Sequence, residues 1–256
     1  MTHNDETPEI YLSVIIPAFN EQERIADSLY TIKDYLSKQS YRSEIIVVDD
    51  GSYDDTAAYV EEFAQQYPGV RLLSYAPNRG KGYAVRTGML AARGDYLLMN
   101  DADGSSPIEE MQKLLAKGEE GFDVVIGSRA MGDPEAVIKA LPHRKYIGNT
   151  FNLIVQKLIL PGIKDTQCGF KLFRRQAAHD IFSVSRLNGY AFDVEILYIA
   201  RLRAYKIAEI AINWANVEGS KVNVLTDSPR MLAEVLRITF SAWFGGYRKL
   251  MLKKKS

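Results

Sequence analysis

The sequence contains a single cysteine, Cys168, among 256 residues, and its 32 basic and 32 acidic side chains give a formal net charge of zero. One cysteine cannot form an intramolecular disulfide bond, which favours a protein of a reducing compartment. The balanced charge argues against a nucleic-acid-binding protein, because such proteins carry an excess of basic side chains. No uncharged apolar run reaches the roughly 18 residues of a membrane-spanning helix, and residues 1–9 are polar and acidic, unlike a secretory signal. We therefore expect a cytoplasmic protein that neither spans a membrane nor binds nucleic acid.

Two further patterns of known enzyme classes are missing. The three histidines, His3, His143 and His179, do not have the spacing of a metal site. Residues 17–20, which follow the first predicted strand, contain no glycine-rich phosphate loop. A sugar nucleotidyltransferase or a Rossmann dehydrogenase would be expected to carry such a loop there, so the sequence disfavours both.

The first half of the chain alternates short apolar runs with amphipathic segments. Strands are predicted at residues 11–16, 44–48, 70–74, 95–99 and 123–126. A helix is predicted to start at Asn20, with Ile25, Leu29, Ile32 and Leu36 on its buried face. Strands rich in Val, Ile and Leu that alternate with helices predict an α/β fold with a mostly parallel sheet covered on both faces.

The second half is less regular. A loop is predicted over residues 128–145, followed by an apolar helix at 146–160 and a second apolar segment at 231–247 that precedes a basic tail. We predict a polar tail at residues 1–10, one domain at 11–228 and an amphipathic C-terminal helix with its tail at 229–256. The two apolar segments suit a membrane surface; the alternatives are ordinary core-facing helices or a contact between copies in an oligomer.

Carboxylates follow two of the predicted strands. Asp101 and Asp103 come after the strand at 95–99, and Asp49 and Asp50 after the strand at 44–48. Ligands of open parallel sheets bind beyond the carboxyl ends of the strands, and carboxylate oxygens suit Mg²⁺ or Mn²⁺. The alternative for Asp101 and Asp103 is a turn that caps the helix after Pro107. The presence of acidic residues at two neighbouring strand ends favours the metal site.

Residues 78–82 form a glycine-rich segment that opens a predicted helix. Its backbone N–H groups or Lys81 could approach a phosphate, although the spacing is not that of a P-loop. The alternative is a simple turn at the start of the helix.

Taken together, the motifs resemble glycosyltransferase family 2, whose fold is the Rossmann-like GT-A fold. Within that family they are similar to the dolichyl-phosphate glucosyltransferases and mannose synthases. The resemblance rests on residues 13–21, 47–52, 78–82, 101–104, 127–129, 165–171, 192–195 and 218–221, in that order. It implies an α/β GT-A fold with amphipathic C-terminal helices.

The resemblance also implies roles for individual residues. The nucleoside would be held by Pro17, Ala18, Glu21 and Asp49. Asp101, Ala102 and Asp103 would lie at the diphosphate, with Asp103 as the chief metal ligand. Arg129 and Arg144 would receive the phosphate of the acceptor, and Lys221 would meet a phosphate from a C-terminal loop. Ser105 stands where mannose synthases commonly have Gln, which leaves its ligand role open.

The activity implied is inverting transfer of glucose from UDP-glucose to a polyprenyl phosphate, with Mg²⁺ or Mn²⁺ as cofactor. The alternatives are a GDP-mannose-dependent mannosyltransferase or another member of family 2. A sensor without turnover is disfavoured, because Asp101, Asp103, Arg129 and Lys221 are all present. A lipid acceptor implies a peripheral enzyme at the cytoplasmic face of a membrane, with oligomers possible.

Overall fold

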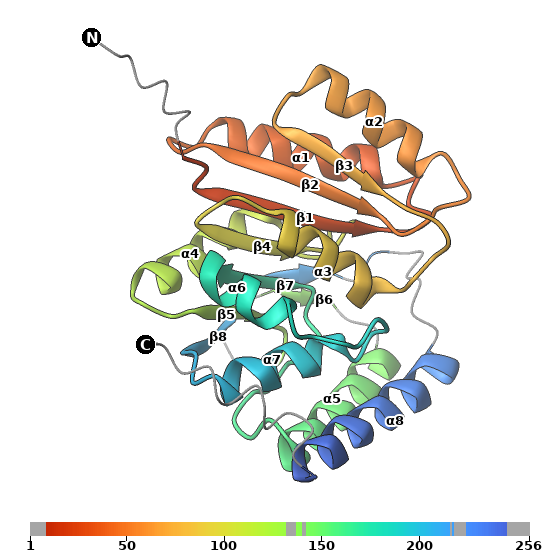
Figure 1. Cartoon of the computed structure of the whole chain (residues 1–256), viewed down its shortest axis with the longest axis vertical. Coiled ribbons are helices and arrows are strands. Elements are labelled where there is room, and N and C mark those ends of the chain that lie inside the picture. The colour runs from red at the N-terminus through yellow and green to blue at the C-terminus, as the bar shows by residue number, and fades with distance from the viewer. Residues whose placement is uncertain (1–8, 132–136, 140–141, 216, 218–223, 245–256) are drawn as a thin grey trace.

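The structure is a computed structural model that describes residues 9–131, 137–139, 142–215, 217 and 224–244. Figure 1 shows a central sheet with helices on both faces and two long helices side by side at one end of the molecule. The strands of the main sheet are β1 (Leu12–Ala18), β2 (Ser43–Asp49), β3 (Val70–Ser74), β4 (Tyr96–Asn100), β5 (Val124–Ser128), β7 (Phe170–Arg174) and β8 (Ile207–Ala211). A small second sheet pairs β6 (Ile138–Lys139) with β9 (Trp214–Ala215).

The helices of the described residues are α1 (Ile25–Ser37), α2 (Thr56–Gln66), α3 (Lys81–Ala91), α4 (Met111–Glu119), α5 (Pro142–Leu158), α6 (Arg175–Phe182), α7 (Phe192–Leu202) and α8 (Val224–Trp243), with a 3₁₀ turn, η1 (Ile108–Glu110), before α4. The main sheet has the order β3-β2-β1-β4-β7-β5-β8. Its neighbours are parallel except for β7, which is antiparallel to both β4 and β5. The predicted α/β class with a mostly parallel sheet is confirmed.

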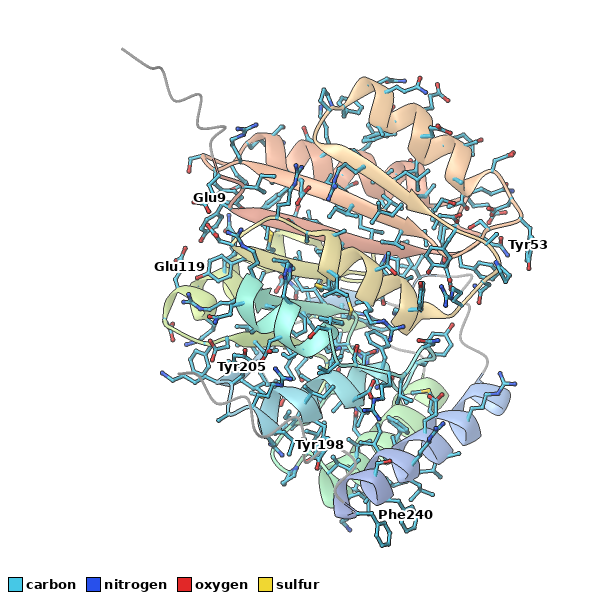
Figure 2. All side chains as sticks on the ribbon, in the orientation of Figure 1. Glu9, Tyr53, Glu119, Tyr198, Tyr205 and Phe240 are labelled. Atoms are coloured by element: carbon cyan, nitrogen blue, oxygen red, sulfur yellow. The ribbon has the colours of Figure 1, made fainter. Side chains whose placement is uncertain are left out.

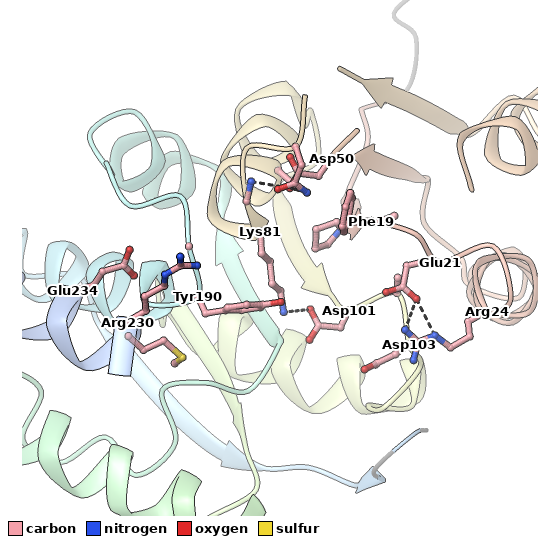
Figure 3. A pocket seen from close by; sticks show the side chains of 18 residues that line it. Phe19, Glu21, Arg24, Asp50, Lys81, Asp101, Asp103, Tyr190, Arg230 and Glu234 are labelled. Carbon is pink, nitrogen blue, oxygen red and sulfur yellow. Dashed lines mark hydrogen bonds and ion pairs between the residues drawn. The ribbon is translucent and has the colours of Figure 1, made fainter. Parts of the chain in front are cut away.

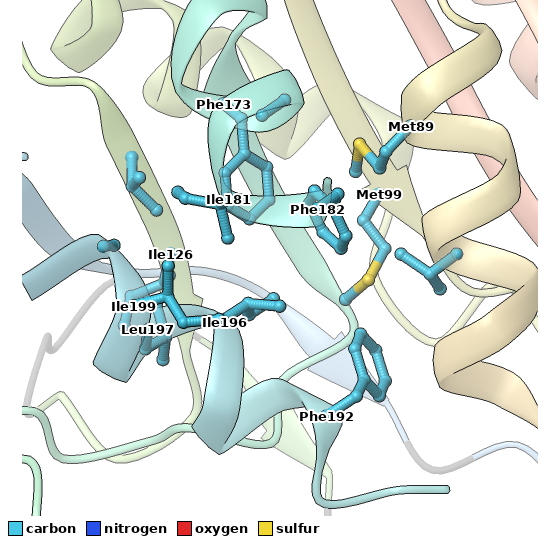
Figure 4. Packing of buried hydrophobic residues seen from close by; sticks show 14 of the residues in the cluster. Met89, Met99, Ile126, Phe173, Ile181, Phe182, Phe192, Ile196, Leu197 and Ile199 are labelled. Carbon is cyan, nitrogen blue, oxygen red and sulfur yellow. The ribbon is translucent and has the colours of Figure 1, made fainter. Parts of the chain in front are cut away.

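Two hydrophobic clusters cover the two faces of the sheet. On one face, Ile15 and Val48 pack with residues of α3, α6 and α7, as Figure 4 shows for part of this cluster. On the other face, Val14 and Val47 pack with residues of α1, α2 and α4. Because successive side chains of a strand point to opposite faces, a sheet buried on both sides needs continuous apolar runs. This requirement explains why β1 is buried along its whole length.

Two predicted element boundaries were wrong at the edge of the site. The first helix begins at Ile25 instead of Asn20, whose positive φ of 53° belongs to a loop. Strand β1 continues beyond Pro17 to Ala18. It tolerates the proline because its pairing with β4 ends at Ile15, so Pro17 lies beside β2 alone.

The second half also differs from the prediction. The predicted loop at 128–145 contains β6 and the first residues of α5, and neither β7 nor β8 was predicted. Helix α8 starts at Val224, so the predicted boundary between residues 228 and 229 falls inside it.

Helices α5 and α8 contact each other, and Val235 and Ile238 of α8 are buried in the core. In the described part of the chain, no helix has the length and apolarity needed to cross a membrane.

Candidate active site

A cavity of about 500 Å³ opens at the carboxyl ends of β1 and β4. From β1, the next two strands of the chain, β2 and β3, are added on one side of the sheet, while β4 pairs with the other side of β1. The direction in which strands are added therefore reverses at β1, and open α/β sheets bind ligands in the crevice that forms at such a point. Many of the predicted site residues line this cavity (Figure 3), namely Pro17, Ala18, Glu21, Lys81, Asp101, Ala102 and Asp103.

Asp101 is held by an ion pair with Lys81, the first residue of α3. The Lys81 Nζ atom lies 2.6 Å from Asp101 Oδ1. Burial acts to lower the pKa of Lys81, but the carboxylates of Asp101, Asp193 and Asp103 outweigh it, and the pKa of Lys81 is raised. Lys81 therefore stays charged at neutral pH, and its ammonium group lies beside the carboxylate of Asp101 in the cavity.

The backbone at Gly169 forms the surface against which Asp101 rests. A Cβ atom at Gly169 would lie 2.0 Å from Asp101 Oδ2, so only glycine leaves room for this carboxylate. The preceding carbonyl oxygen, of Cys168, accepts a 2.6 Å hydrogen bond from the Nζ atom of Lys171. Lys171 is fully buried and forms an ion pair with Asp193 at 2.5 Å. The backbone behind Asp101 is thus fixed by a buried charged pair.

Asp103 is oriented by its own turn. Its Oδ1 atom accepts hydrogen bonds from the backbone N–H of Ser105 at 2.9 Å and from the Ser105 hydroxyl at 2.6 Å. These two bonds fix the carboxylate at the edge of the cavity. Ser105, whose role the sequence left open, thus orients Asp103 in this structure.

At the end of β2, the neighbouring aspartates have different environments. Asp49 is buried outside the cavity lining, where it accepts hydrogen bonds from Ser52 N at 3.2 Å and from Ser74 Oγ at 2.9 Å. Asp50 lines the cavity and accepts three bonds of 2.8 Å from the loop before α3, donated by Asn78 Nδ2, Arg79 N and Gly80 N. From the sequence, Asp49 was assigned to the nucleoside. The role of Asp50 in holding the loop before α3 was not predicted.

The loop after β1 is joined to the loop after β2. Asn20 N donates to Ser52 Oγ at 2.9 Å, and Tyr53 N donates to Asn20 Oδ1 at the same distance. Glu21 accepts a 2.8 Å hydrogen bond from Arg24 Nε. These contacts fix the end of the cavity at which the nucleoside was predicted to bind.

Arg129 lies outside the cavity lining and forms a bidentate pair with Asp165. Its Nε and Nη2 atoms lie 2.8 and 2.9 Å from the two carboxylate oxygens. Burial acts to raise the pKa of Asp165, but Arg129 outweighs it and lowers that pKa to about 2. Two of the guanidinium nitrogens predicted to receive the acceptor phosphate are therefore already bound. The backbone of Arg144 belongs to α5, while the Arg144 side chain and the whole of Lys221 lie outside the described residues.

Replacing Arg129 with alanine is expected to lower the free energy of unfolding by about 3 kcal/mol, because it leaves the Asp165 charge buried without its partner. The Asp165 side chain is only 1% exposed. Arg175→Ala is the matched control, since the pair of Arg175 with Asp95 is exposed, and it should cost about 1 kcal/mol or less. Urea denaturation measures both variants. Equal losses would show that the Arg129 pair is no stronger than an exposed one.

The opposite wall of the cavity was not predicted from the sequence. It consists of Gly189 and Tyr190, which precede α7, and of Arg230, Met231 and Glu234 on α8. The apolar pattern of α8 indicated an amphipathic helix. That pattern does not show that the helix lies beside residues more than a hundred positions earlier in the chain.

Comparison with known proteins shows the family of the chain. The family model of "Glycosyl transferase family 2" matches residues 13–182. The chain belongs to this family. It is 41% identical to the dolichyl-phosphate beta-glucosyltransferase of Dictyostelium discoideum over 250 residues, which are 92% of this chain and 76% of the relative. It is 37% identical to the dolichyl-phosphate beta-glucosyltransferase of Homo sapiens, over 97% of this chain and 81% of the relative.

Solved structures share the fold at low sequence identity. Glucosyl-3-phosphoglycerate synthase from Mycobacterium tuberculosis, in complex with phosphoglyceric acid, superposes with a TM-score of 0.67 at 19% identity, over 91% of this chain and 81% of that one. The complex of the same enzyme with Mn²⁺, UDP and glucosyl-3-phosphoglycerate gives a TM-score of 0.67 at 18% identity, with the same coverage. The predicted GT-A fold is confirmed.

Proposed function

We propose that this family 2 glycosyltransferase transfers glucose from UDP-glucose to a polyprenyl phosphate of the dolichyl type, with inversion at the anomeric carbon. The observation that carries the proposal is the similarity to dolichyl-phosphate beta-glucosyltransferases along almost the whole chain, at 36 to 41% identity in Dictyostelium discoideum, Mus musculus and Homo sapiens. The cavity supports it, because six of the seven residues that the family resemblance assigns to the nucleoside and diphosphate line it, all except Asp49.

The site fits a divalent cation shared between protein and donor. Asp101 and Asp103 both present oxygen atoms to the cavity, and Mg²⁺ or Mn²⁺ prefers such ligands. No cluster of three or more His, Cys, Asp or Glu side chains suited to a metal occurs within the described ranges. Asp101 and Asp103 would be the residues that hold such an ion. Such an ion would supply Lewis-acid stabilisation of the departing nucleotide.

The reaction requires the protein mainly to position the acceptor phosphate and the sugar donor. The second pKa of a phosphate monoester is about 6, so the acceptor is largely a dianion at neutral pH and needs no general base. One of its oxygens forms a bond to the anomeric carbon while the bond from that carbon to the diphosphate oxygen breaks. The electron pair of that bond leaves with UDP, and no proton is transferred. Lys81, which remains protonated beside Asp101, would counter the charge that develops on the diphosphate.

The stereochemistry of the product tests the mechanism. A single in-line displacement on α-linked UDP-glucose gives a β-linked glucosyl phosphate, whose anomeric proton shows a large trans-diaxial coupling in the NMR spectrum. An α-linked product would contradict the proposed displacement.

We further propose that the enzyme acts at the cytoplasmic face of a membrane through α5 and α8. Leu236 and Phe240 of α8 are 40% and 54% exposed, and Phe244, just beyond the helix, is 86% exposed. Leu153 and Leu158 of the adjacent α5 are 51% and 40% exposed. Phe240 projects from the lower end of the molecule in Figure 2. Large apolar side chains gathered on two neighbouring helices suit the interface in which a polyprenyl phosphate keeps its head group.

Replacing Phe240 and Phe244 together with serine is expected to reduce flotation with anionic liposomes about tenfold or more, because each buried aromatic ring contributes about 1.5 to 3 kcal/mol. Truncation of α8 is a poorer test, since Val235 and Ile238 belong to the core. The control replaces Tyr30 and Tyr59, which are 51% and 48% exposed on α1 and α2. The control should float like the parent protein. Equal flotation of both double variants would remove this surface as the anchor.

A further inference from the structure

Helix α8 connects the cavity with the exposed apolar side chains. Near its start, Arg230, Met231 and Glu234 form part of the cavity wall. Phe240 lies ten residues after Arg230 and is exposed. At 1.5 Å per residue the two positions are about 15 Å apart along the helix axis. One helix therefore offers a continuous path from the polar site to the surface proposed to meet the membrane.

Arg230 differs from the other cationic side chains of the cavity in its partners. Among the residues that the structure describes, three such side chains line it, namely Arg24, Lys81 and Arg230. Arg24 is paired with Glu21, and Lys81 is paired with Asp101. Arg230 is exposed and takes part in none of the ion pairs of the described residues, although its charge acts on Glu234 one turn further along α8. Of these three cations, Arg230 can therefore bind an incoming anion without first breaking an ion pair.

Arg230 also lies across the cavity from Asp103. In Figure 3, Arg230 and Glu234 face Asp103 and Glu21 across the cavity, with Lys81 and Asp101 between them. An inverting displacement requires the attacking oxygen and the departing diphosphate on opposite sides of the anomeric carbon. With the diphosphate at Asp101 and Asp103, the attacking phosphate belongs near the wall formed by α8.

We propose that Arg230 binds the phosphate group of the polyprenyl phosphate acceptor, with Met231 beside the first apolar carbons of its chain. The proposal rests on the proposed function. A guanidinium group donates two parallel hydrogen bonds to phosphate oxygens and stays charged at any working pH. In this arrangement Arg230 orients the attacking phosphate.

The test compares Arg230→Met with Arg237→Met. Both changes remove a guanidinium and keep a flexible apolar stem, and Arg237 is exposed on the same helix outside the cavity lining. Initial rates are measured at saturating UDP-glucose while the concentration of polyprenyl phosphate is varied in neutral detergent micelles. Calorimetry gives the Kd for UDP-glucose in the presence of Mn²⁺.

We expect Arg230→Met to raise the acceptor KM about tenfold or more, the effect of losing a charge-assisted hydrogen bond. The Kd for UDP-glucose should stay within about twofold, and Arg237→Met should change neither constant by more than that. A weaker Kd for UDP-glucose with an unchanged acceptor KM would assign Arg230 to the donor and overturn the proposal. Equal effects of the two variants would overturn it as well. If the parent enzyme transfers no glucose in this assay, the proposed function fails first and the assignment of Arg230 fails with it.

Discussion

Replacing Asp103 with alanine is expected to lower glucose transfer by about three orders of magnitude, because the site loses one of two carboxylates that would hold the metal at the diphosphate. The side chain lies at the edge of the cavity, and in the described part of the chain its hydrogen bonds come from Ser105 in its own turn. Its removal takes little from the core, so the far-UV circular dichroism and the Tm should remain close to those of the parent protein.

Asp54→Ala is the matched control for this change. Asp54 Oδ1 accepts a backbone bond from Thr56 N at 3.1 Å and a hydroxyl bond from Thr56 Oγ1, as Asp103 Oδ1 does from Ser105. Asp54 Oδ2 also accepts a 3.3 Å bond from Gln22 N. Asp54 is not part of the cavity lining, and its variant should keep most of the activity. Transfer at the parental rate in excess EDTA, or equal losses from the two variants, would contradict a metal role for Asp103.

Gly169→Ala is expected to lower transfer about a hundredfold and to weaken Mn²⁺-dependent binding of UDP, because the new methyl group would displace Asp101. A Cβ atom at this position would lie within 2.0 to 2.6 Å of all three atoms of the Asp101 carboxylate. The backbone cannot easily move away, since Lys171 binds the carbonyl oxygen of Cys168. Calorimetric titration with UDP, with and without Mn²⁺, measures the loss.

Gly69→Ala serves as the control for the loss of a glycine. Its Cβ atom would meet only the carbonyl oxygen of Ser43, at an ordinary distance of 3.6 Å. Activity and UDP binding should therefore remain near the parental values. If Gly169→Ala binds UDP and Mn²⁺ as tightly as Gly69→Ala, then Asp101 does not depend on the backbone behind it.

The strand-end part of the site could be predicted from sequence because it follows from strand order. The carboxyl ends of β1 and β4 meet because these neighbouring strands are parallel, so Pro17 near the end of β1 and Asp101 just after β4 were both predicted at the site. Lys81 was identified because a glycine-rich turn opens its helix. In each case a local sequence pattern pointed to the residue, and the family resemblance assigned it a role.

Other parts of the site depend on contacts between distant segments. Strand β7 enters the sheet antiparallel between β4 and β5, and its buried Lys171 interrupts the apolar pattern that would have revealed a strand. The pair of Arg129 with Asp165 joins two motifs that were recognised separately, and sequence gives no measure of their distance. The placement of Arg230 in the cavity wall depends on how α8 packs against α5 and α7, which an amphipathic pattern does not specify.

The most direct test of the proposed function is a transfer assay with the full chain, radiolabelled UDP-glucose, dolichyl phosphate and Mn²⁺ or Mg²⁺, followed by extraction into organic solvent. We expect labelled glucose in the organic phase only when both the lipid phosphate and the metal are present. Labelled GDP-mannose in a parallel reaction should yield little or no lipid-linked label. Preferential transfer from GDP-mannose, or no lipid-linked product from UDP-glucose with any polyprenyl phosphate, would contradict the proposed activity.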